Sequence, residues 1–149
     1  MNLKEEVYKH CLAIINNKIS LLQLTLNDLR NSAANETKST AGDKHETALA
    51  MLQIEQENTG RQLQEALQQK LHLERIQIEL KTTNVVNGSL VKTDKGFLFI
   101  CCAIGRLSVN EISIIAISPQ SPLGSKLLGL QVNNTVEMNK IIYTIEEIN

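Results

Sequence analysis

Aromatic residues and long apolar runs are both scarce in this sequence. Only 3% of its 149 residues are aromatic and none is Trp, so it lacks the aromatic surfaces on which single-stranded nucleic acid stacks. No stretch approaches the roughly 20 apolar residues of a membrane-spanning helix, and residues 2–6 do not resemble a signal peptide. We therefore expect a cytoplasmic protein with no membrane partner.

An excess of one charge is also missing. The 15 basic and 16 acidic residues leave a net charge of -1, so no overall field attracts the chain to nucleic acid or to a membrane. Cys11, Cys101 and Cys102 suit neither a disulfide framework nor a CxxC metal site. Because two of them lie in the apolar run 97–104, we predict buried structural thiols in preference to a nucleophile.

Proline is absent from the first 81 residues, and this absence divides the chain. Those residues include two glycines and are mostly good helix formers. The remainder has two prolines, five glycines and many β-branched residues, a composition typical of short strands and turns. We predict an α+β protein with a helical domain at 1–81 and a small β-rich domain at 82–149.

An unbroken heptad pattern marks the first helix. Apolar residues recur in steps of four and three, which places them on one stripe of a helix and calls for a helical partner. This seam consists of Tyr8, Leu12, Ile15, Ile19, Leu22, Leu26 and Leu29. A helix over residues 3–33 would span about 45 Å at the standard rise per residue.

A second helical stretch, 43–81, follows a short polar break at 35–42. An association between chains would not need this break, so the pattern favours an antiparallel hairpin within one chain. We predict a monomeric coiled-coil hairpin whose tip lies near 35–46. The polar middle of the second helix, 55–62, interrupts its apolar pattern.

Strand-like runs alternate with turn signals in the second half. Asn87-Gly88 is a strong turn dipeptide, and residues 123–128 are long enough for one short helix. Together these features predict a compact unit of five strands and one helix. The expected strands cover 89–92, 96–104, 111–118, 132–138 and 140–148.

Two acidic residues, Asp43 and Glu46, stand three positions apart at the start of the second helix. Their carboxylates share a helix face and could supply part of the shell of a divalent metal. The same spacing caps many helices and suits the positive end of the helix dipole, so capping is the commoner explanation of the pattern alone. Lys38 and Lys44 flank the tip, and His45 fits a solvated residue.

The tip resembles that of the GreA/GreB family of bacterial transcript cleavage factors. Gly42, Asp43, Glu46 and Ala48 match the family's Gly-Asp-x-x-Glu-x-Ala pattern. Residues 117–123, Ile-Ser-Pro-Gln-Ser-Pro-Leu, and the Leu-Leu-Gly at 127–129 are similar to a second family pattern. The resemblance implies an FKBP-like fold for the domain that follows the hairpin.

The resemblance further implies a transcription elongation factor that is not an enzyme by itself. Its second domain docks on RNA polymerase and its hairpin enters the secondary channel. There Asp43 and Glu46 help to hold a catalytic Mg²⁺ shared with the polymerase, which cleaves backtracked nascent RNA; the chain itself binds no cofactor tightly. Lys38 and Lys44 then either contact RNA phosphates or keep the tip soluble. The implied docking segment comprises Ser118, Pro119, Ser121 and Pro122.

Three other functions compete with this one. A channel-binding regulator that does not cleave RNA would use the same hairpin, and Ala50 stands where the family commonly has an aromatic residue. A prolyl isomerase is a weaker alternative, because its site needs aromatic side chains and residues 82–149 contain only Phe97, Phe99 and Tyr143. A purely structural coiled-coil adaptor would leave the tip acids and the Ser-Pro segment unexplained.

Overall fold

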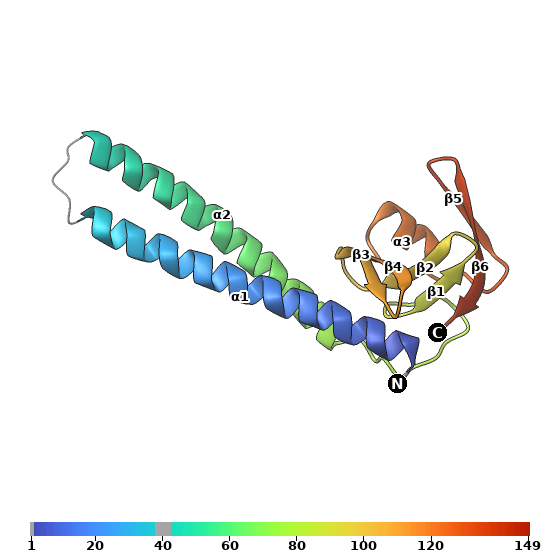
Figure 1. The fold of residues 1–149 in the computed structure, drawn as a ribbon. Coiled ribbons are helices and arrows are strands. Elements are labelled where there is room, and N and C mark those ends of the chain that lie inside the picture. Colours follow the sequence, from blue (N-terminus) through green and yellow to red (C-terminus); the bar gives the residue numbers. More distant parts are fainter. Residues whose placement is uncertain (1, 38–42) are drawn as a thin grey trace. The chain divides into compact units, whose positions relative to one another are not determined.

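The computed structural model describes residues 2–37 and 43–149. Two long helices, α1 (Leu3–Thr37) and α2 (Asp43–Glu74), precede a six-stranded sheet (Figure 1). The chain divides into two compact units. One, the hairpin unit, is Ala13–Lys70; the other, the sheet unit, combines Met1–Leu12 with Leu71–Asn149. The predicted boundary at 81/82, taken as a limit between folding domains, stays a prediction.

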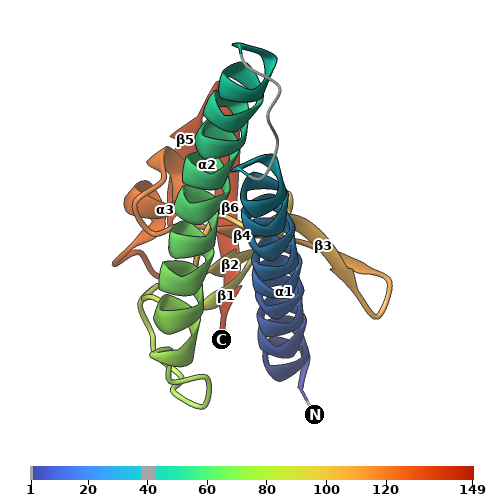
Figure 2. The ribbon, with the colours of Figure 1, turned by 90° about the vertical axis from the view of Figure 1, so that its left-hand side faces the viewer.

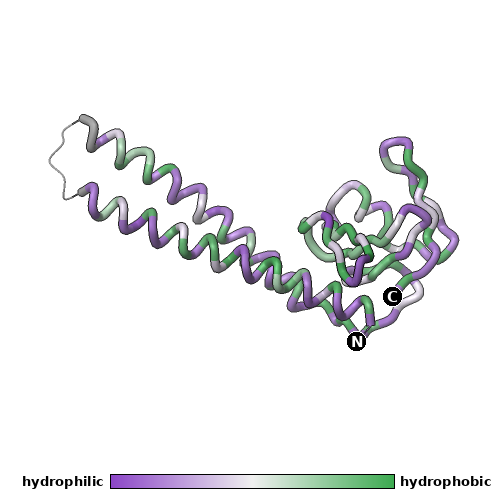
Figure 3. Tube along the Cα trace, in the orientation of Figure 1, coloured by the Kyte–Doolittle hydropathy of each residue, from purple (hydrophilic) through white to green (hydrophobic). Residues whose placement is uncertain are grey.

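Within the hairpin unit, α1 and α2 run side by side in opposite directions (Figures 1 and 2). The heptad seam of α1 faces inward as predicted: Ile15, Ile19 and Leu26 are buried, and Leu22 and Leu29 are half-buried. Hydrophobic and hydrophilic residues alternate along both helices (Figure 3). The two helices therefore hold each other through a narrow apolar stripe.

The inward stripe of α2 runs through the polar middle of the helix. Its buried or half-buried residues also recur in steps of four and three, and Gly60 does not break the helix. Gln56 and Thr59 take seam positions that apolar residues would fill in a uniform coiled coil. The inward residues of this stretch are Leu52, Gln56, Thr59, Leu63 and Ala66.

The second helix ends at Glu74, so the predicted end near Lys81 is wrong. The helix closes with a tighter turn, in which the Ile76 amide donates a hydrogen bond to the Leu73 carbonyl at 3.1 Å. The same carbonyl accepts the Tyr8 hydroxyl at 3.0 Å. Contacts made within the sheet unit thus override the helix propensity of residues 75–81.

Six strands form one mixed sheet in the order β3-β4-β2-β1-β6-β5. Only β2 and β4 pair in parallel. A short helix, α3 (Pro122–Leu127), lies between β4 and β5 in the sequence. The strands are β1 (Leu90–Thr93), β2 (Gly96–Ile100), β3 (Gly105–Val109), β4 (Ile112–Ile117), β5 (Thr135–Met138) and β6 (Ile141–Ile148). The predicted α+β class and short helix are confirmed.

The prediction of five strands is wrong, because β3 was overlooked. It forms a hairpin with β4 through Asn110 and Glu111, which both have positive φ. A two-residue hairpin turn of this kind is usually signalled by Gly, and none is present here. The expected strand 96–104 also ends early, at Ile100, before the bends at residues 101–103.

Both faces of the sheet are buried. On one face Val91, Leu98 and Ile145 pack with Leu127 of α3. On the opposite face Leu90, Phe99 and Ile114 are at most 2% exposed, although α3 covers the other side. The sheet unit therefore needs a second cover, which its helical segments supply.

Residues of α1 and α2 form that cover. Val7, Cys11 and Leu73 have no exposed surface, and the free thiol of Cys11 lies close enough to the free thiol of Cys101, next to β2, to raise the pKa of Cys101. The Glu6 carboxylate also accepts a hydrogen bond from the Asn110 amide, at the turn of the β3–β4 hairpin. The first turns of α1 are therefore part of the sheet unit's core.

Among the residues that the structure describes, no helix is long and apolar enough to cross a membrane.

Candidate functional site at the start of the second helix

The predicted tip acids occupy the first turn of α2. Asp43 is the first residue of that helix, and Glu46, one turn along, is exposed. The side chains of Asp43, Lys44 and His45 lie outside the described part, as does the whole of Lys38. A helix start presents free backbone N–H groups and a positive dipole end, so it stabilises acidic side chains.

The first helical turn can present two carboxylates to one ligand. Positions three apart in a helix are neighbours on its surface, and carboxylate oxygens are the protein ligands that Mg²⁺ prefers. Two carboxylates leave coordination positions that water, a phosphate oxygen or other protein groups would fill. Among the described residues no cluster of three metal-binding side chains occurs.

The Ser-Pro segment is organised by its own hydrogen bonds. Ser121 caps α3: its hydroxyl accepts the Gly124 amide at 3.0 Å and donates to the Ser118 carbonyl at 2.7 Å. The Ser118 hydroxyl accepts the Gln120 amide at 3.1 Å, and Pro122 opens the helix, where its fixed φ is favourable. These side chains thus have a structural role, while docking on a partner stays a prediction.

Gly124 allows the Ser-Pro turn to close. A Cβ at this position would lie 2.1 Å from the Ser118 carbonyl oxygen. Any larger residue would push α3 away from the end of β4. The turn therefore requires the spacing from Ser118 to Gly124. A serine directly before a proline at a helix start is a capping signal that the sequence already contains.

The three cysteines meet inside the sheet unit, as thiols that are all buried. Hydrogen bonds to Cys102 and Cys11, together with burial, raise the pKa of Cys101. The prediction of buried thiols is confirmed. The inclusion of Cys11 was missed, because nothing in the sequence relates residue 11 of a helix to a strand end 90 residues later.

Two further side chains of α1 bond the backbone near the end of α2. The Lys4 ammonium donates to the Leu80 carbonyl at 3.0 Å, and burial lowers its pKa. Burial and the charge of Glu74 raise the pKa of Tyr8. Sequence reasoning assigned Tyr8 to the hairpin seam and gave no role to Lys4, whose burial has no sequence signal.

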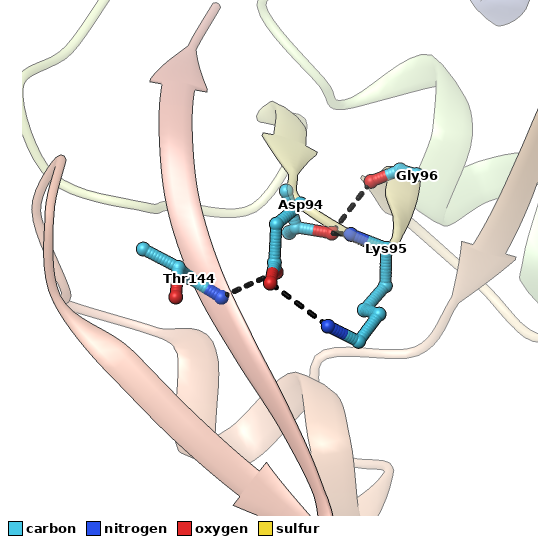
Figure 4. Close-up of polar contacts among 5 residues, drawn as sticks. Asp94, Lys95, Gly96 and Thr144 are labelled. Atoms are coloured by element: carbon cyan, nitrogen blue, oxygen red, sulfur yellow. Dashed lines mark hydrogen bonds and ion pairs between the residues drawn. The ribbon is translucent and has the colours of Figure 1, made fainter.

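The exposed turn between β1 and β2 is hydrogen-bonded to β6 (Figure 4). The Asp94 carboxylate accepts the Thr144 amide at 2.8 Å and the Lys95 ammonium at 2.9 Å. These bonds, that from the Thr144 amide first, lower the pKa of Asp94. The cluster fixes β6 beside the β1–β2 turn, which is a structural task.

Phe99 and Tyr143 occupy separate places in the sheet unit. Phe99 is fully buried on the face away from α3. Tyr143 packs against the core on the α3 side. These two aromatic side chains therefore lie on different faces of the sheet, and a prolyl isomerase stays the weaker alternative.

Comparison with known proteins identifies no relatives: no family model matches the chain, and no curated protein matches it.

Proposed function

We propose that this chain is a divergent Gre-type factor that enters the secondary channel of RNA polymerase and stimulates cleavage of backtracked nascent RNA. The observation that carries the proposal is the position of Asp43 and Glu46. Both lie in the first turn of α2, beside the turn of a helical hairpin. Capping explains an acid at this place, but not the whole Gly-Asp-x-x-Glu-x-Ala pattern.

In this proposal Asp43 and Glu46 supply oxygen ligands and do not form a complete active site. In two-metal hydrolysis one Mg²⁺ would activate water and the other would stabilise the leaving oxygen, and the two acids would help to hold one of these ions. The polymerase supplies the remaining ligands, and Lys38 and Lys44 contact RNA phosphates. The exposure of Glu46 supports this role, since a ligand shared with a partner has to be accessible.

The sheet unit takes the docking role, and we propose that its fold is FKBP-like. A mixed sheet with a short helix on one face supports this assignment. Because the hydroxyls of Ser118 and Ser121 are used internally, recognition in the Ser-Pro segment rests on its shape. Gln120 and Pro122 are the exposed residues that such a partner contacts.

A regulator that occupies the channel without cleavage is the second candidate. It is favoured by Ala50, an exposed small residue where the family commonly has an aromatic one. Without that aromatic side chain the tip would lose a means of positioning the RNA end. The two candidates share a partner and differ in the reaction.

RNA cleavage in stalled, backtracked complexes of the cognate polymerase tests the proposal. Adding the chain with Mg²⁺ is expected to shorten the RNA from its 3′ end, and the shortened RNA resumes extension. The chain with Lys44→Gln is expected to cleave more slowly, as one phosphate contact is lost. Binding without shortened RNA at any Mg²⁺ concentration would favour the non-cleaving regulator; no binding would end both proposals.

A further inference from the structure

Lys4 is a buried basic side chain. Only 7% of the residue is exposed, and its ammonium makes one hydrogen bond, to the Leu80 carbonyl. Within the described part of the chain, no carboxylate forms an ion pair with it. Lys4 also lies in the first turn of α1, where the helix dipole disfavours a positive charge.

Such a charge is costly unless something compensates it. Removing an ammonium group from water requires a counter-charge or several hydrogen bonds. One carbonyl satisfies only one of the three donors of a lysine ammonium. An anion from outside the chain would supply what the protein does not.

A cavity beside Lys4 has the charge to attract an anion. It measures about 270 Å³ and is lined by Lys4 and Arg75, with no acidic residue in its wall. The side chains of Gln77 and Asn87 add amide groups, and Ile76 forms part of an apolar wall. The side chain of Asn87 is in turn hydrogen-bonded to His72.

A second cavity on Lys4 provides an internal contrast. It measures about 350 Å³ and contains Glu79 and Glu147 as well as Lys4 and Lys81. Its lysines and acids balance, so it has no preference for an anion. Of these two cavities, the first has two basic residues and no acidic residue in its wall.

We infer that the cavity of Lys4 and Arg75 binds the phosphoryl group of a small phosphorylated molecule. A guanidinium can hold two phosphate oxygens at once, and an ammonium adds a point charge. The volume is just below the usual range of small-molecule sites, which suits a phosphate monoester with a short carbon chain against Ile76. This inference is independent of the proposed action on RNA polymerase.

Binding should stabilise the sheet unit. The ligand would connect the first turn of α1, through Lys4, to the segment after α2, through Arg75. A ligand that binds only the folded state raises the melting temperature, and the stabilisation grows with the logarithm of one plus the ratio of free ligand concentration to Kd. Melting temperature and calorimetric affinity are therefore two independent measures.

The test compares inorganic phosphate, glycerol phosphate and acetate at one ionic strength, with the full chain. We expect saturable binding of both phosphates and none of acetate. Tighter binding of glycerol phosphate would support an organic ligand; tighter binding of inorganic phosphate would overturn that part of the inference. If all three anions change the melting temperature equally and weakly, they act only by screening charge, and the inference of a phosphate site is overturned.

Arg75→Gln is the informative variant, because Arg75 is exposed and its loss leaves the core intact. It is expected to weaken phosphate binding at least about tenfold, as a charge-assisted pair of hydrogen bonds is lost. Arg61→Gln, at an exposed arginine of α2 in the hairpin unit, is the matched control and should bind normally. Lys4→Met should abolish the phosphate-dependent rise in melting temperature. Equal affinity in the Arg75 and Arg61 variants would contradict the site.

Discussion

The hairpin unit and the sheet unit of this chain differ in how they bury apolar residues. In the hairpin unit, Leu21 and Leu24 of α1 and Met51 and Ile54 of α2 are 57–65% exposed. In the sheet unit, residues such as Phe99 have no exposed surface at all. One region buries a single stripe, whereas the other buries both faces of a sheet.

The difference shows where most of the stability of the fold arises. Two helices joined through one stripe exclude little apolar surface from water, so they gain little free energy beyond their own propensity. The sheet unit, closed by α3 on one side and by the first turns of α1 on the other, supplies most of the core. A region with little core tolerates changes on its surface and is free to carry polar side chains for recognition.

The largest expected effect is truncation of the sheet core. Phe99→Ala removes a fully buried ring and should lower the free energy of unfolding by about 3–5 kcal/mol, through lost burial and the cavity left behind. Leu24→Ala, at a side chain 61% exposed in α1, should change it by less than about 0.5 kcal/mol. Urea unfolding followed by circular dichroism measures both. Similar losses in the two variants would refute the contrast between the units.

Two glycine-to-alanine substitutions, one in each unit, should change the free energy of unfolding in opposite directions. Gly124→Ala places a Cβ 2.1 Å from the Ser118 carbonyl oxygen, and the forced backbone shift should cost about 1–3 kcal/mol. Gly60→Ala in α2 meets no atom within 4 Å and should stabilise the helix by about 0.5–1 kcal/mol. Thermal unfolding of both variants is the measurement, and a stabilising Gly124→Ala would show that the Ser-Pro turn is not tightly closed.

The smallest expected effect concerns pH and the exposed Asp94. Because its pKa is lowered in the folded state, the ionised form stabilises the fold above the unfolded value of about 3.9. This contribution is lost as the pH falls through the folded pKa. Asp94→Asn should therefore give a shallower loss of stability below about pH 4 than the wild type, as followed by urea unfolding at several pH values. Parallel curves would mean that the carboxylate contributes nothing.

The hairpin was largely predictable from the sequence, because the heptad seam from Ile15 to Leu29 is a local pattern. The end of α2 at Glu74 was not, since it depends on Tyr8 and on the packing of Ile76 against Gly88. Likewise β3 was missed because its turn uses Asn110 and Glu111 in place of glycine. Local periodicity thus predicted the elements, whereas contacts between distant segments determined where they stop.

The candidate site was predictable in position and not in chemistry. The motif placed Asp43 and Glu46 at the start of α2, as observed. Capping and metal binding use the same two acids at the same spacing, so the helix start alone does not distinguish them. Lys4 and Arg75 left no signal, because a buried lysine is recognised only once the fold surrounds it.

The most direct test of the account is to separate binding from cleavage in one variant. Asp43→Asn/Glu46→Gln removes both tip charges with little change in shape and leaves the sheet unit untouched. We predict that this variant binds RNA polymerase with the affinity of the wild type and competes with it for the channel, while cleavage of backtracked RNA falls by at least a hundredfold. Cleavage at the wild-type rate would contradict the metal-holding role of the tip. Loss of binding would contradict the division of tasks between the two units.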